Sequence, residues 1–284
     1  MSTEERKDDK YLYGLKPNED TMKGHGLRTA ESECQYMLPT LKSMIESNPK
    51  LRLLDVGCGP GSITTGLARY MPEGYVTGFD LSEVVLDKAR QTAMDQKCTN
   101  ADFVQGDVYN LPFEDDAFNV VHTHQAVCHF HEQIKAIKEL LRVIKPGGIL
   151  CMREADFHTV RFWPPQPLLD ECFEMIRAVQ RANGGIPDAG IQLKHCTVEA
   201  GVPRDKIEFT AGSFVYHTRE QTEAFGMTWP GRVTEGALAD KAVEMGFAKS
   251  GRKRLEEYGQ AWKRWARDED ALFIMLHGEV IAHV

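Results

Sequence analysis

Short apolar runs alternate with amphipathic segments through the middle of the chain, beginning at Leu51. The apolar runs predict five buried strands, at 53–56, 75–80, 102–107, 118–123 and 148–152. Apolar residues at helical spacing predict the intervening helices, including 62–70 and 131–143. Strands that alternate with helices form right-handed βαβ units, so we expect a parallel sheet.

The flanking regions extend this pattern. Upstream, apolar residues at helical spacing predict a helix over 28–46. Downstream, the pattern predicts a helix at 168–182, a strand at 206–214, mostly helical structure at 219–268, and a final strand at 271–281 near the sheet edge. We therefore expect a doubly wound, mostly parallel seven-stranded α/β sheet, with a helical cap over the strand ends, where open α/β sheets bind ligands.

Composition limits the classes of binding partner and the cellular compartments that we expect for this chain. The 284 residues, of which 42% are hydrophobic, suit one large α/β domain. A net charge of -8 repels phosphate backbones and anionic lipids, so we expect neither nucleic acid nor a membrane as partner. The seven cysteines contain no CxxC pair, which favours free thiols in a reducing compartment and predicts no metal site. Because no secretory signal or membrane span is evident at the N-terminus or beyond it, we expect a cytoplasmic protein.

A glycine-rich segment, LLDVGCGPGS, follows the first predicted strand. Its three alternating glycines, Gly57, Gly59 and Gly61, let the chain turn sharply into a helix while the backbone approaches a ligand. The NAD fingerprint G-x-G-x-x-G would require glycine where Ser62 stands. The observed spacing, with Asp55 two residues before the first glycine, instead favours S-adenosylmethionine, whose zwitterionic methionine end Asp55 and the loop amides can receive.

Two further acidic residues end the next two predicted strands. Asp80 ends VTGFD, where a carboxylate can accept both ribose hydroxyls. Asp107 ends FVQGD, where a carboxylate can accept the adenine amino group while Val108 packs on the ring. Either residue alone could be a helix cap, but both at matching strand ends after the glycine loop predict a cofactor site.

These motifs resemble, in order and spacing, the UbiE-type class I methyltransferases. The resemblance rests on LLDVGCGPGSIT, VTGFDLS, FVQGDVYNLPF, HQAVCHF and VIKPGGIL, and continues in GHGLRTAESECQYMLPTL, TWPGRVTEGALADKAVEMGF and AWKRWARDEDALFIMLHGEVI. It covers nearly the whole chain and points to a functionally mixed branch of that family, so it implies a methyltransferase that acts on a small molecule.

The resemblance also implies a set of site residues. Those expected to contact the cofactor are Gly57, Gly59, Gly61, Asp80, Leu81, Asp107 and Val108. His124 and Gln125 are expected near the methionine and the methyl group, and Arg28 near the cofactor carboxylate. Cys128 stands where the family more often has glutamine, and we interpret it as a small buried hydrophobic residue.

The cofactor assignment divides the chain into four predicted parts. They are an N-terminal segment and helix covering the cofactor site (1–46), an S-adenosylmethionine-binding core (47–155), cap helices with one further strand (156–268), and a final sheet strand (269–284). In the cap, Trp163, Tyr216 and Trp229 are candidates to line an apolar acceptor pocket, with the segment around Tyr11 to His25 as the alternative.

Methyl transfer from a sulfonium to an acceptor is an in-line displacement, in which alignment and exclusion of water are the protein's main contributions. Where the acceptor must lose a proton, His124 and His129 are the candidate bases, and His25 a further one. The sequence leaves open a non-catalytic regulator that binds the same cofactor, and an NAD-dependent dehydrogenase. A homodimer is compatible with the sequence.

Overall fold

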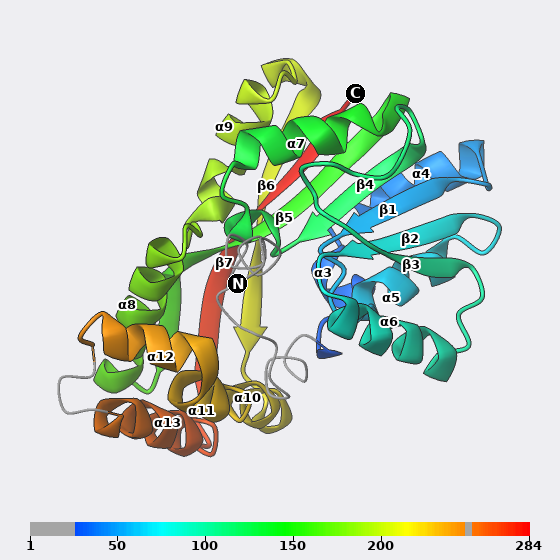
Figure 1. The fold of residues 1–284 in the computed structure, drawn as a ribbon. Helices are drawn as coiled ribbons and strands as arrows, with labels where there is room; N and C mark the ends of the chain where they lie inside the picture. Colours follow the sequence, from blue (N-terminus) through cyan, green and yellow to red (C-terminus); the bar gives the residue numbers. More distant parts are fainter. Residues whose placement is uncertain (1–25, 248–251) are drawn as a thin grey trace, which may run out of the picture. The chain divides into compact units, whose positions relative to one another are not determined.

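The computed structural model describes residues 26–247 and 252–284, and its strands form one seven-stranded sheet (Figure 1). The strand order is β3-β2-β1-β4-β5-β7-β6. The strands are β1 (Arg52–Val56), β2 (Tyr75–Asp80), β3 (Ala101–Gln105), β4 (Phe118–His124), β5 (Ile144–Trp163), β6 (Ile207–Tyr216) and β7 (Leu272–His283). The first five strands pair in parallel, which confirms the predicted doubly wound sheet.

Helices precede, connect and follow these strands. The α-helices are α3 (Ala30–Glu33), α4 (Leu38–Ser47), α5 (Ser62–Tyr70), α6 (Glu83–Asp95), α7 (Gln133–Arg142), α8 (Pro167–Ala182), α9 (Ala189–Glu199), α10 (Arg219–Gly226), α11 (Trp229–Thr234), α12 (Gly236–Glu244) and α13 (Lys253–Trp265). Two short 3-10 helices are η2 (Val127–His129) and η3 (Arg204–Lys206). No helix within the described ranges has both the length and the apolar character needed to cross a membrane.

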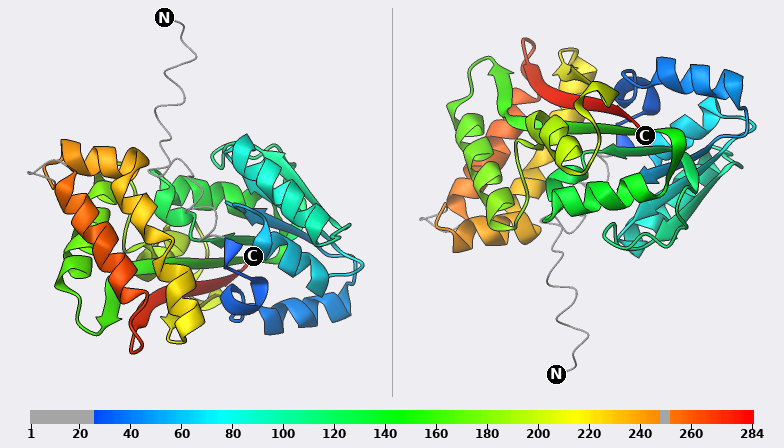
Figure 2. Two further views of the ribbon diagram at one scale, coloured as in Figure 1. Left: turned by 90° about the horizontal axis from the view of Figure 1, so that it is seen from below. Right: turned by 90° about the horizontal axis from the view of Figure 1, so that it is seen from above.

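The central strand β1 is buried on both faces. Leu53 packs in a core with residues of α4 and α5, whereas the next residue, Leu54, packs in a second core with residues of α7 and α9. Successive side chains of a strand point to opposite faces, so this alternation means that helices cover both faces of the sheet. Figure 2 shows α4 and α7 on opposite faces of the sheet.

The chain divides into two compact units. One contains residues 26–156, 188–212 and 276–284 of the described chain, and the other contains 157–187, 213–247 and 252–275. One boundary lies between α8 and α9. The other three fall within β5, β6 and β7, so each of these strands contributes to both units. Residues 188–212, which we predicted to lie in the cap, belong with the first unit.

The second unit is built around aromatic side chains. Trp262 is fully buried, stacks on Trp229 with ring centroids 5.0 Å apart, and meets Trp265 edge to face at 5.7 Å. Tyr216 stacks on Phe225 at 4.5 Å. Trp229, at the start of α11, and Tyr216, at the end of β6, thus both pack against other aromatic rings of this unit.

Two predicted elements were wrong. The single helix at 28–46 is divided into α3 and α4. Proline lacks an N–H and is tolerated only in the first turn, so Pro39 sets the start of α4 at Leu38. Thr29 caps α3 separately, because its hydroxyl accepts a hydrogen bond from the Ser32 amide at 3.2 Å.

The fifth strand is the second error, because it extends far beyond the predicted 148–152. The segment KPGG, which precedes the predicted strand, lies inside β5 as an irregularity. Phe118 pairs with Ile144 and Val120 with Ile149, so the extra residues loop out of the pairing, and Gly147 takes a φ of 79°. The strand also continues to Trp163, through residues that we had assigned to the cap.

Candidate active site

The glycine loop after β1 has the conformation that its sequence predicts. Gly57, Gly59 and Gly61 have φ values of 72°, 54° and 77°, which favour glycine. A Cβ on Gly57 would lie 2.5 Å from the Cβ of Ala126, so this turn excludes larger residues. At Gly59 nothing lies within 4 Å of the Cβ position, so a ligand can approach the backbone there.

Asp80, at the end of β2, is bound to the glycine loop. Its Oδ2 accepts a hydrogen bond from the Gly59 amide and its Oδ1 one from the Ser82 amide, each at 3.1 Å. The carboxylate is half-buried, and desolvation raises its pKa although these amides act to lower it. The next residue, Leu81, is exposed. The glycine loop and Asp80 are therefore neighbours in the structure.

Asp107 and Val108 follow β3 beside the end of β2. Asp80 pairs with Gln105, and the Gly106 amide donates to the Asp80 carbonyl at 3.1 Å. Asp107 is half-buried, and its Oδ1 accepts a hydrogen bond from the Tyr109 amide at 2.9 Å. Val108 packs against the core. The two predicted acidic residues thus follow adjacent strands at the same edge of the sheet.

Asp55 has a more internal position than the sequence suggested. It is buried, its Oδ2 accepts a hydrogen bond from the Thr64 hydroxyl at 2.6 Å, and its Oδ1 lies 2.7 Å from Nδ1 of His122. Burial acts to lower the pKa of His122, but the Cys34 sulfur and the Asp55 carboxylate raise it. Asp55 therefore joins β1 to β4 and α5, and its contact with the cofactor stays a prediction.

The end of β4 carries His124 and then Gln125. Burial is the largest cause that lowers the pKa of His124 well below its usual value, and the nearby charges of Arg28 and Arg153 act in the same direction. His124 is therefore neutral at neutral pH. Gln125 has a φ of 50°, which is unusual for a residue with a side chain. Its backbone N–H donates a hydrogen bond to the Arg153 carbonyl at 2.9 Å.

His129, the other predicted base, lies in η2. Burial, followed by the charges of Arg28 and His131, lowers its pKa to about 4. The neighbouring Cys128 is buried, and burial raises its pKa well above the usual value, so it is a neutral thiol, in agreement with our interpretation. Arg28 is half-buried, and its charge also acts to lower the pKa of Glu33. His25 and the segment from Tyr11 lie outside the described residues.

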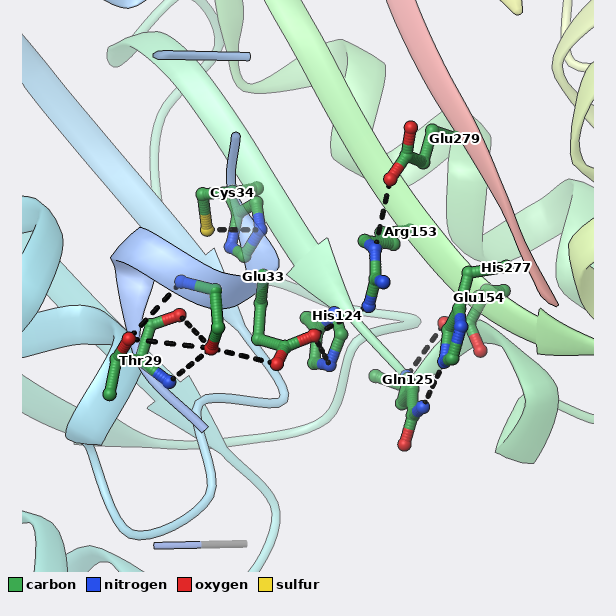
Figure 3. Close-up of polar contacts among 12 residues, drawn as sticks. Thr29, Glu33, Cys34, His124, Gln125, Arg153, Glu154, His277 and Glu279 are labelled. Atoms are coloured by element: carbon green, nitrogen blue, oxygen red, sulfur yellow. Dashed lines mark hydrogen bonds and ion pairs between the residues drawn. The ribbon is translucent and has the colours of Figure 1, made fainter. Parts of the chain in front are cut away.

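Sequence reasoning missed a buried ionic network next to His124 (Figure 3). Nη1 of Arg153 lies 2.6 Å from Oε2 of Glu33, and its Nε lies 3.0 Å from Oε1 of Glu279. The same Glu33 oxygen lies 3.6 Å from Nε2 of His124. The available signal was a pair of charged residues, Arg153 and Glu154, inside the apolar run of β5, because charges are rarely buried unless they are paired.

Glu154 holds the loop that follows Gln125. Its Oε1 accepts hydrogen bonds from the amides of Ala126 and Val127, both at 2.7 Å, and its Oε2 one from the Cys128 amide at 3.4 Å. Burial raises the pKa of Glu154 to about 7, although these amides act to lower it. One carboxyl group thus fixes the start of η2 relative to β5.

These residues fit S-adenosylmethionine. The loop gives a backbone that a ligand can approach at Gly59, and Asp80 and Asp107 supply carboxylate acceptors for hydroxyl and amino groups at the ends of neighbouring strands. The described residues contain no group of three or more histidine, cysteine or acidic side chains placed to hold a metal ion.

Comparison with known proteins identifies the family of the chain. Residues 47–223 match the family model of a methyltransferase domain. An uncharacterized methyltransferase of Schizosaccharomyces pombe is 34% identical over 90% of this chain and 91% of its own length. A demethylmenaquinone methyltransferase of Staphylococcus haemolyticus is 30% identical over 58% of this chain and 74% of its own.

The fold agrees as well. A solved structure from Bacillus halodurans, described as a candidate methyltransferase, superimposes with a TM-score of 0.54 at 21% identity, covering 86% of this chain and 97% of that one. The predicted resemblance to UbiE-type enzymes is confirmed, and with it the cofactor and the small-molecule acceptor. The chain belongs to the class I methyltransferase family and is an S-adenosylmethionine-dependent methyltransferase.

Proposed function

We propose that S-adenosylmethionine binds along the carboxyl ends of β1, β2 and β3, and that the methyl group is transferred beside His124 and Gln125 at the end of β4. The observation that carries this proposal is the hydrogen bond between Asp80 and the amide of Gly59, which joins the glycine loop to the predicted ribose-binding carboxylate. The parallel register brings the four strand ends to one edge of the sheet.

The cofactor-binding residues in this proposal are Arg28, Asp55, Gly57, Gly59, Gly61, Asp80, Leu81, Asp107, Val108, His124 and Gln125. The loop amides and Arg28 would receive the methionine carboxylate, while Asp80 and Asp107 would accept hydrogen bonds from the nucleoside. Amides and dipoles that are already oriented need little reorganisation when a charged ligand binds. The network around Arg153 would keep this edge in one conformation.

When bound, S-adenosylmethionine supplies an electrophilic methyl group, which the acceptor atom displaces in line from sulfur. The chain's own contribution is to align the acceptor and, where that acceptor carries a proton, to remove it. His124 is a candidate for this role because it ends β4 and burial keeps its imidazole neutral, although the same lowering of its pKa makes it a weak base. His129, neutral for the same reason, is the second candidate.

We propose further that the enzyme acts in the cytoplasm on a small, largely apolar molecule and not on nucleic acid. The net charge of -8 and seven cysteines that form no disulfide support this location and partner. Trp163, a residue that is 56% exposed, remains a candidate for the acceptor pocket, whereas the aromatic contacts of Trp229 and Tyr216 favour a structural role for these two residues.

Isothermal titration calorimetry tests the cofactor site directly. The purified protein should bind S-adenosylmethionine and its demethylated product, S-adenosylhomocysteine, saturably and with one site per chain, and should show no heat of binding with NAD. Saturable binding of NAD without a response to either sulfur compound would refute the proposed site.

A further inference from the structure

The residue after β4, Gln125, is held in an uncommon backbone conformation by contacts on both sides. Its φ is 50°, a region that disfavours residues with a Cβ. The backbone N–H of Gln125 donates to the Arg153 carbonyl, and the backbone N–H groups of the next two residues, Ala126 and Val127, donate to the Glu154 carboxylate. Two successive residues of β5 thus lock the backbone at this point, and such strain often marks a functional position.

The side chain of Gln125 is held by a residue far away in the sequence. Nε2 of Gln125 lies 2.6 Å from Nε2 of His277, a fully buried residue of β7. The His277 ring is also stacked beside that of His124, with centroids 6.3 Å apart and planes inclined by 14° (Figure 3). Because an amide nitrogen only donates, Nε2 of His277 must accept this hydrogen bond. The imidazole proton of neutral His277 is then on Nδ1.

This hydrogen bond determines which atom Gln125 presents. The amide nitrogen faces His277, so the carbonyl oxygen Oε1 is directed away from it, as Figure 3 shows. A carbonyl oxygen accepts hydrogen bonds and cannot donate them. Neither the cofactor site described above nor the predicted bases account for this pair.

We propose that His277 is a positioning residue, which orients the Gln125 amide so that Oε1 faces the group to be methylated. The proposal rests on the proposed function, in which methyl transfer takes place at the end of β4. There, Oε1 can accept a hydrogen bond from a hydroxyl or amino group of the acceptor and so align it. In this role His277 would act through Gln125 and not on the acceptor itself.

The tautomer of His277 is the first test, and it needs neither acceptor nor cofactor. In protein labelled with ¹⁵N-histidine, two-dimensional NMR distinguishes a protonated ring nitrogen from an unprotonated one, and a His277→Gln variant assigns the resonances. We expect the proton to be on Nδ1 and Nε2 to be unprotonated. A proton on Nε2 would mean that His277 donates to Oε1, which reverses the amide and overturns the proposal.

A substitution gives the second test. In Gln125→Glu the carboxylate cannot donate, so His277 should become protonated at Nε2. The matched control is Gln105→Glu, the same chemical change in an exposed side chain at the end of β3, where the amide donates to the Leu81 carbonyl. The His277 signals should be unchanged in the control. Unchanged His277 signals in folded Gln125→Glu would also refute the pairing.

Calorimetry with S-adenosylhomocysteine separates this inference from the proposed function. If Oε1 faces the acceptor, His277→Gln, which removes the residue that orients it, should bind S-adenosylhomocysteine within about threefold of the unmodified protein. A loss greater than about tenfold would show that Oε1 serves the cofactor instead, and would overturn the assigned role. Failure of the unmodified protein to bind would refute the proposed site, whereas the tautomer experiment would still decide the pairing.

Discussion

At the scale of single residues, Asp80 is the side chain whose charge should matter most for cofactor binding. Replacing it with asparagine keeps an acceptor for the Ser82 amide but removes the charge offered to the ribose hydroxyls. Hydrogen bonds to charged groups contribute about 1.5–3 kcal/mol, so we expect the affinity for S-adenosylhomocysteine to fall by about 10- to 150-fold in Asp80→Asn. Calorimetry measures this loss directly.

The control for this substitution is Asp102→Asn, which makes the same change in an exposed side chain of β3. Its affinity should equal that of the unmodified protein, and both variants should unfold cooperatively. If Asp80→Asn is folded and binds S-adenosylhomocysteine normally, Asp80 does not hold the ribose.

Glu154 should make stability depend on pH. Burial raises its pKa to about 7 in the folded protein, above its usual value of 4.5. Its contribution to stability is then fully present below about pH 4.5 and is lost as the pH rises through about 7. Relative to Glu154→Gln, the free energy of unfolding of the unmodified protein should therefore fall by up to about 3 kcal/mol between pH 5 and pH 8.

Urea denaturation of both proteins across this pH range measures the difference, in which other titrating groups cancel. Parallel pH profiles for the two proteins would show that Glu154 is already ionised at pH 5 in the folded state. In that case the amides of Ala126, Val127 and Cys128 would outweigh the desolvation of the carboxylate.

At the scale of elements, the glycine loop allows two substitutions to be compared. Gly57 and Gly59 both have positive φ, but a new Cβ clashes with Ala126 only at Gly57. Gly59→Ala should cost about 1–2 kcal/mol for the backbone conformation alone. Gly57→Ala should cost about 1–3 kcal/mol more, because Ala126 and the loop after β4 must shift.

Urea denaturation gives the free energy of unfolding of each variant. The matched change at Gly59 controls for the backbone, so the difference between the two variants reports the steric contact. Equal losses would mean that Ala126 and its neighbours move without cost, and that Gly57 is required only for its φ.

The same loop shows which elements the sequence could predict. Strands β1 to β4 are local apolar runs, and the glycine cluster after β1 and the acids at the ends of β2 and β3 lie within a few residues of these runs. The continuation of β5 is different. Its residues Arg153, Glu154 and Asp156 resemble a surface segment. Burial of Arg153 is made favourable by partners in α3 and β7, and burial of Glu154 by backbone amides after β4.

The candidate site also contains residues that the sequence could predict and residues that it could not. Glycine spacing and strand-end acids predicted the cofactor edge, and the structure brings these residues together. Glu33, His277 and Glu279 were missed because each lies in a segment whose own pattern is that of an ordinary helix or strand. Their chemistry arises from pairing across more than one hundred residues of sequence, as in the 2.6 Å contact between Glu33 and Arg153.

At the scale of the whole molecule, the described chain forms two compact units, and the predicted parts 156–268 and 269–284 are each divided between them. Strands β5, β6 and β7 each run through a boundary between them, and a strand cannot easily unfold over half its length while the other half stays paired. We therefore expect the two units to unfold together in a single transition.

Ligand binding tests this cooperativity, because the four tryptophans of the chain, Trp163, Trp229, Trp262 and Trp265, all lie in one unit, whereas the predicted cofactor residues lie in the other. A ligand at 100 times its dissociation constant stabilises the folded state by about 2.7 kcal/mol. S-adenosylhomocysteine at that excess should raise the free energy of unfolding by this amount. The increase measured by tryptophan fluorescence should equal the increase measured by circular dichroism. Asp80→Asn at the same ligand concentration should gain much less. Separate transitions, with the fluorescence transition insensitive to ligand, would show instead that the tryptophan-containing unit unfolds independently of the cofactor-binding one.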